Sequence, residues 1–208
     1  MDSYWNVRYH EEGLIWGQNP SSTAFHARDI FKQNNVTTVL VPGSGYGRNT
    51  KALSADFTVE GIELSGHAVK LARQWDPQSH FMEGSVLDSP TGGKKYDAVY
   101  CFDLLHLFLL KDRRKLIDHC IKQLNDSGIM YFTCFSDEDT HNGAGKRVEE
   151  GTFEYMEGKC AHFFTEEDLI NHFGGLNLME VGSVTEKLTY QDERTKEYLL
   201  RYIVVKKD

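Results

Sequence analysis

Two features of the sequence could hold a nucleoside: a glycine-rich run and a glutamate that follows it. Glycine occupies every second position from Gly43 to Gly47. Glycine lets the backbone approach a ligand closely and adopt positive φ. Glu63 follows Gly47 by sixteen positions (63 − 47), and a carboxylate accepts both hydroxyl hydrogens of a ribose. We therefore expect residues 42–49 and Glu63 to bind a nucleoside together.

The spacing of the glycines narrows the kind of nucleoside. A dinucleotide fingerprint requires G-x-G-x-x-G, but the sixth position is Arg48 when counted from Gly43 and Thr50 when counted from Gly45. The chain has no G-x-x-x-x-G-K-[ST] run, so a P-loop is excluded. NAD is thus disfavoured as the cofactor, and a purely structural glycine turn remains the simplest alternative.

The elements that must position these residues are alternating strands and helices. In an open parallel sheet, ligands bind beyond the carboxyl ends of the strands, so both features should follow strands. Apolar, β-branched runs predict strands at 36–41, 57–62, 79–82, 96–102 and 129–135. Helical spacing predicts helices at 21–35 and 65–75, and one or two helices across 104–124. This alternation predicts a doubly wound α/β sheet with helices on both faces.

The last third of the sequence departs from this alternation. Glycine and charge dominate residues 136–158, which we interpret as a lid-like insertion over the site. Thr165 and the acids after it indicate a helix start. Residues 178–190 and 198–205 resemble strands joined by a polar turn around 191–196, which predicts an antiparallel hairpin at the sheet edge.

Length and composition indicate one cytoplasmic domain over residues 1–208. The 31 acidic residues exceed the 23 lysines and arginines, which gives a formal charge of −8 and disfavours nucleic acid as a partner. The longest apolar run, 101–110, is too short to span a membrane and contains two polar residues. The four cysteines form no Cys-x-x-Cys pair, so no metal site is indicated. Either a monomer or a homodimer is expected.

Two motifs resemble those of class I S-adenosylmethionine-dependent methyltransferases. The loop 42–47 looks like their first motif, with Pro42 in place of the acidic residue often found there. The segment 61–65 resembles the end of their ribose-binding strand. The resemblance implies S-adenosyl-L-methionine as cofactor, S-adenosyl-L-homocysteine as product, and a seven-stranded, mostly parallel sheet whose last strand is antiparallel.

Two further segments extend this resemblance over most of the chain. Residues 84–88 look like the adenine-binding loop, with Ser85 where aspartate is common, and residues 96–106 are similar to the segment beside the cofactor's methionine part. The cofactor contacts implied by the resemblance are Gly43, Ser44, Gly45, Tyr46, Gly47, Asn49, Glu63, Leu64, Ser85, Val86, Cys101 and Phe102.

The N-terminal segment is similar to that of the thiopurine and tellurite-resistance methyltransferases. The similarity rests on residues 4–9 and 16–17. It implies that segment 1–20 covers the cofactor and that the acceptor pocket includes Trp5, Arg8, Tyr9 and Trp16. The alternative is that these aromatic side chains only pack in the core.

Methyl transfer from a sulfonium depends mainly on positioning, because the donor is already reactive. An acceptor that loses a proton needs a base near the end of the fourth strand, where Asp103 and His106 stand. Each has a structural alternative, as a helix cap or a core histidine. No Asn/Asp-Pro-Pro-Tyr run follows that strand, so we expect a small-molecule acceptor. A non-catalytic S-adenosylmethionine-binding module or an NAD-dependent oxidoreductase are the alternatives.

Overall fold

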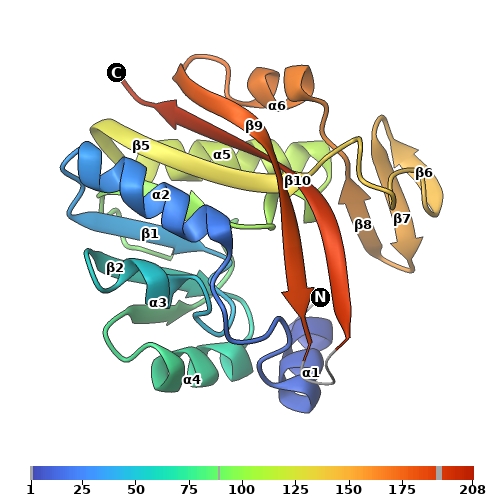
Figure 1. The fold of residues 1–208 in the computed structure, drawn as a ribbon, viewed down its shortest axis with the longest axis horizontal. Coiled ribbons are helices and arrows are strands. Elements are labelled where there is room, and N and C mark those ends of the chain that lie inside the picture. The colour runs from blue at the N-terminus through green and yellow to red at the C-terminus, as the bar shows by residue number, and fades with distance from the viewer. Residues whose placement is uncertain (1, 89, 191–193) are drawn as a thin grey trace.

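A central seven-stranded sheet organises the computed structural model, which describes residues 2–88, 90–190 and 194–208 (Figure 1). The strand order is β3-β2-β1-β4-β5-β10-β9. The strands are β1 (Thr38–Pro42), β2 (Thr58–Glu63), β3 (His80–Glu83), β4 (Tyr96–Cys101), β5 (Leu124–Phe135), β9 (Asn177–Thr189) and β10 (Thr195–Lys206). Strands β1 to β5 run parallel, whereas β10 is antiparallel to β5 and to β9. The predicted doubly wound sheet and its terminal hairpin are confirmed; residues 191–193 of the expected turn lie outside the described residues.

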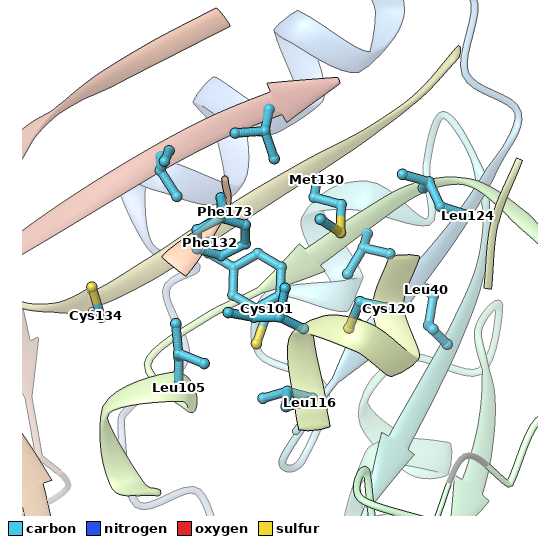
Figure 2. Close-up of a cluster of buried hydrophobic side chains, with 14 of the residues drawn as sticks. Leu40, Cys101, Leu105, Leu116, Cys120, Leu124, Met130, Phe132, Cys134 and Phe173 are labelled. Carbon is cyan, nitrogen blue, oxygen red and sulfur yellow. The ribbon is translucent and has the colours of Figure 1, made fainter. Parts of the chain in front are cut away.

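Helices cover both faces of this sheet (Figure 1). On one face α2 (Ser22–Gln33) and α3 (Thr50–Leu53) bury Phe31 and Leu53 against β1, β4 and β5. On the other, α5 (Leu110–Gln123) and α6 (Glu166–His172) cover a cluster that includes Cys101, Met130 and Phe132 (Figure 2). No helix formed by the described residues has both the length and the apolar character required to span a bilayer.

Side-chain hydroxyls cap three helix starts, and the sequence analysis predicted the one at Thr165. The Ser21 hydroxyl accepts the Thr23 N–H at the start of α2, and the Ser65 hydroxyl accepts the Ala68 N–H at the start of α4 (Gly66–Trp75). Thr165 caps α6, whose first turn is acidic and so complements the helix dipole. The 104–124 segment divides into a short 3-10 helix, η1 (Leu105–Leu107), and α5.

Part of the segment predicted to be a lid-like insertion, together with the residues that follow it, forms strands. It forms a separate antiparallel sheet of β6 (Lys146–Glu149), β7 (Thr152–Met156) and β8 (Lys159–His162), which we call the small sheet. The His162 ring anchors it, because one ring nitrogen lies 2.8 Å from the Thr152 hydroxyl and the other 2.7 Å from the Asp168 carboxylate on α6. These contacts join residues ten and six positions apart, and they form only when the strands fold back on one another, so local composition did not reveal them.

An additional helix, α1 (Asp2–Glu12), precedes the alternating pattern and packs on α4. The Asn6 side-chain oxygen accepts hydrogen bonds from the Ser65 hydroxyl at 3.0 Å and the His67 N–H at 3.1 Å. Asn6 thereby ties α1 to the first turn of α4, beside the carboxyl end of β2.

Candidate functional site

The glycine loop and Glu63 meet at the carboxyl edge of the sheet, where the strand order reverses between β1 and β4. One Glu63 carboxylate oxygen accepts the Gly45 N–H at 3.0 Å, and the other accepts the Ser65 N–H at 2.8 Å. Burial raises the pKa of Glu63, while these backbone hydrogen bonds lower it. The carboxylate and the loop therefore form one connected unit.

The loop needs glycine for both conformation and space. Gly43, Gly45 and Gly47 have φ of 68°, 55° and 83°, which L side chains rarely adopt. A Cβ at Gly45 would also lie 2.9 Å from the Tyr9 hydroxyl. Residue 45 thus brings bare backbone against both Glu63 and α1.

The groups present at this edge fit the ribose of a nucleoside. An ionised carboxylate has about four acceptor sites, so Glu63 retains capacity beyond its bonds to the backbone. The Ser44 hydroxyl is buried and has no hydrogen-bond partner among the described residues. A buried hydroxyl without a partner is costly unless a ligand or water meets it.

Two other residues of the loop turn their side chains toward the N-terminal segment. The Tyr46 hydroxyl donates to the Gly17 carbonyl, and the Asn49 side-chain oxygen accepts the Ser21 N–H at 2.9 Å. These hydrogen bonds hold the glycine loop against Gly17 and the start of α2.

Arg48 is a site residue that the sequence analysis did not single out. Its guanidinium forms a buried ion pair with Glu186 of β9 at 3.2 Å and donates to the carbonyls of Trp16 and Asn19. It also lies 5.2 Å from the centre of the Phe102 ring. Arg48 therefore links the glycine loop to the terminal hairpin, a contact that no local motif could indicate.

Of the remaining residues that the sequence analysis placed near the cofactor, some lie at the surface and one lies in the hydrophobic core. Leu64 is 36% exposed at the edge, and Ser85 turns its hydroxyl to accept the Leu87 N–H at 3.1 Å. Val86 is half-buried, and its carbonyl accepts a hydrogen bond from His119. The Cys101 side chain packs inside the core cluster with Leu105, Leu116 and Cys120 (Figure 2), so only its backbone can face a ligand.

Asp103 stands directly beyond β4 in a left-handed backbone conformation, with φ of 48°. The Thr133 hydroxyl donates to its carboxylate at 3.0 Å and accepts the Asp103 N–H at 2.9 Å. Burial, together with the nearby Glu186 carboxylate, raises the pKa of Asp103 to about 7, although Thr133 and Arg48 act in the opposite direction. A carboxyl with this pKa exchanges protons near neutral pH.

His106, the other candidate base, lies in the core. It is 2% exposed and stacks on Phe135 with 3.8 Å between ring centres. Burial lowers its pKa to about 3, so the ring is neutral. Its Nδ1 has no hydrogen-bond partner among the described residues.

The four residues expected at the acceptor pocket are brought together around α1. Arg8 lies 4.6 Å from the centre of the Trp16 ring and 5.8 Å from that of Trp5. Tyr9 is buried against Tyr46 of the glycine loop, with 6.2 Å between ring centres. They pack as a third apolar cluster, and a hollow beside Trp16 extends to Arg48 and to Thr189 and Tyr190 of the hairpin.

Comparison with known proteins agrees with this geometry. Residues 40–132 match the model of a family described as a methyltransferase domain. This segment of the chain is therefore similar to a methyltransferase domain. The matched segment runs from β1 into β5 and so contains the glycine loop, Glu63 and Asp103.

One curated relative is the tRNA N(3)-methylcytidine methyltransferase Mettl2 of Drosophila melanogaster. It is 24% identical over 159 residues, which cover 71% of this chain and 48% of the relative. The chain thus spans about half the length of that relative.

Solved structures share the fold over nearly the whole chain. The structure on conversion of a disulfide bond into a thioacetal group during echinomycin biosynthesis has a TM-score of 0.79 and 14% identity, covering 100% of this chain and 92% of that one. TehB from Haemophilus influenzae has a TM-score of 0.69 and 11% sequence identity, and the match covers 98% of this chain and 67% of TehB. The magnesium protoporphyrin IX methyltransferase of Synechocystis PCC 6803 with bound S-adenosylhomocysteine has a TM-score of 0.69 and 17% sequence identity. The match covers 100% of this chain and 98% of that one. TehB is one neighbour among several, so the narrower tellurite-resistance group is not singled out.

Proposed function

We propose that this protein transfers the methyl group of S-adenosylmethionine to an acceptor held at the carboxyl edge of the sheet. The observation that carries the proposal is the unit formed by Glu63 and the glycine loop. Glu63 would hold the ribose hydroxyls, residues 43–47 would lie along the nucleoside, and the loop at Ser85 and Val86 would border the adenine. Bound there, the cofactor supplies a methyl group activated by its sulfonium.

Asp103 is our candidate for the proton acceptor. It follows β4 at the same edge, and its pKa of about 7 suits a general base near neutral pH. As the acceptor atom bonds to the methyl carbon, the carbon–sulfur bond breaks and its electron pair stays on sulfur. The acceptor's proton passes to the Asp103 carboxylate. We assign His106 a packing role, because it is buried, neutral and stacked on Phe135.

A small molecule is the first acceptor class that we propose. Trp5, Arg8, Tyr9 and Trp16 gather beside the glycine loop, and the small sheet reaches the same region, since the Lys159 ammonium lies 4.0 Å from the centre of the Tyr4 ring. Two covers that meet in this way exclude water from a small acceptor. A base in RNA is the second class, because the curated relative is a tRNA methyltransferase.

Calorimetry and an acceptor screen test this function. We expect S-adenosylmethionine and S-adenosylhomocysteine to bind the wild-type protein, NAD not to bind, and Glu63→Gln to weaken binding. Release of S-adenosylhomocysteine would then be screened against thiols, halides, selenite, tellurite, amine metabolites and tRNA. Failure of both sulfur nucleosides to bind would refute the proposal. Tight binding without turnover on any acceptor would instead indicate a non-catalytic binding module.

A further inference from the structure

Helix α5 has one buried and one strongly basic exposed face. The buried residues recur at helical spacing and are Arg113, Leu116, Ile117, Cys120 and Gln123. The exposed residues follow the same spacing and are Lys111, Arg114, Lys115, Asp118 and Lys122. We call the four cations of this second set the α5 basic face. They line a shallow groove together with Leu110 and His119, and two carboxylates, Asp118 and Glu149, also line it.

The cations of the α5 basic face are unpaired within the described part of the chain. None of the four side chains makes a hydrogen bond, an ion pair or a ring contact there, and elsewhere in the described ranges only Lys70, Lys95, Lys146 and Lys206 share this state. Most other cations are compensated; the buried Arg113 of the same helix, for example, approaches the Glu149 carboxylate at 3.6 Å. Unpaired positive charge is thus concentrated on one helix of a protein with a net charge of −8.

The α5 basic face begins beside the candidate site. At the first residue of α5, the Leu110 N–H donates to the Glu149 carboxylate of β6 at 3.0 Å. The face therefore starts at the small sheet and runs along the helix away from the carboxyl edge. From Lys111 to Lys122 it extends about 16 Å, at about 1.5 Å per residue.

We propose that the α5 basic face binds the phosphate backbone of a nucleic-acid strand. Cations spaced along one line complement the regular charges of such a strand. A protein interface would need a buried aromatic anchor, and a lipid surface would need apolar side chains to insert. The exposed large apolar side chains all lie outside α5, although Leu109 immediately precedes it.

Binding of a phosphate backbone at α5 depends on the positive charge of that helix rather than on the negative net charge of the whole protein. The acidic surface elsewhere weakens non-specific association with a polyanion, so binding should depend strongly on a few cations and on salt. A strand lying along α5 would bring its end to the small sheet and the carboxyl edge. That last step rests on the proposed function, with a base in RNA as the acceptor.

Two triple variants with identical chemistry test the α5 basic face. The first is K111Q/K115Q/K122Q, and its matched control is K70Q/K95Q/K206Q, which removes three unpaired lysines outside α5 and the small sheet. Both have a net charge of −11 (−8 − 3). Fluorescence anisotropy would follow binding of labelled 20-nucleotide RNA and DNA of mixed sequence, with polyglutamate as the acidic-peptide comparison. We expect the wild type to bind the nucleic acids, with affinity falling as salt rises.

We expect the α5 triple variant to lose about 100-fold in affinity at 0.1 M salt, since each lost phosphate contact changes the salt slope by about 0.7 on a single strand. The control should stay within about threefold of the wild type. Equal losses in the two variants, no binding by the wild type, or equally tight binding of polyglutamate would overturn the proposal. Equal binding of RNA and DNA would support it, because the backbone is then the feature recognised.

Binding of S-adenosylhomocysteine separates this inference from the proposed function. Calorimetry on the wild type and both triple variants should give the same affinity, because the α5 basic face lies outside the Glu63 site. If this nucleoside binds and nucleic acid does not, the docking proposal fails and the proposed function stands. If RNA binds through α5 and S-adenosylhomocysteine does not bind, the proposed function fails and the docking proposal stands.

Discussion

Replacing Asp103 with asparagine tests the effect of one half-buried carboxyl group on stability. Asparagine tolerates the positive φ at this position, and its side-chain oxygen can still accept the Thr133 hydroxyl. The pKa of Asp103 rises from an ordinary 3.8 to about 7 on folding. A carboxyl with the higher pKa when folded holds more protons in the folded state, so its contribution to stability falls as pH rises from about 4 to about 7.

The size of this effect follows from those two pKa values. Linkage gives a decrease of about 2.5 kcal/mol in the free energy of unfolding between pH 5 and pH 8. Urea denaturation of the wild type and Asp103→Asn at both pH values should show this decrease in the wild type only. Other titrating groups contribute equally to both proteins and cancel. If both proteins change by the same amount, burial does not perturb Asp103 as reasoned.

Three other variants probe the loop and its supports. Glu63→Gln should weaken the binding of S-adenosylhomocysteine about 10- to 100-fold in calorimetry, because the hydrogen bonds lost are charge-assisted. Unchanged affinity would contradict the proposal that Glu63 holds the ribose. Gly45→Ala should lower the free energy of unfolding by about 1–2 kcal/mol through its positive φ and the Tyr9 hydroxyl, and adding Tyr9→Phe should recover part of that loss if the contact matters. Glu186→Gln should destabilise by about 3 kcal/mol in urea by leaving Arg48 buried and unpaired, whereas a double change to R48M/E186M should recover stability.

Asp103 also provides a kinetic test of the proposed general base. Once an acceptor is known, kcat/KM should rise with pH and reach a plateau above an apparent pKa near 7, because only the ionised carboxylate accepts a proton. Asp103→Asn should reduce kcat/KM by about 100-fold or more and remove this pH dependence. A wild-type profile retained by the variant would assign the proton to another group.

The sheet and the centre of the site could be predicted because their signals are local. A buried strand such as β1 is apolar along its length, and each capping serine stands at the helix that it starts. The position of Glu63 after β2 indicated a meeting with the glycine loop, and the hydrogen bond from Gly45 is the result. In each case a few neighbouring residues carry the information.

The features that escaped prediction depend on distant partners. Helix α1 is held by Asn6 on the first turn of α4, which lies 59 to 61 positions further along the chain. The side chains of Tyr46 and Asn49 turn to the N-terminal segment for partners that no spacing rule identifies. Glycine and charge in the insertion gave no sign of strands, because cross-strand pairing creates them.

The ion pair between Arg48 and Glu186 sets an order of events during synthesis. The two residues are 138 positions apart, so the ribosome delivers the glycine loop long before the carboxylate that neutralises it. Until β9 has emerged, the guanidinium must stay hydrated, and the loop cannot settle against the hairpin. A nascent chain stopped before Glu186 should therefore have most of its sheet but no finished nucleoside pocket.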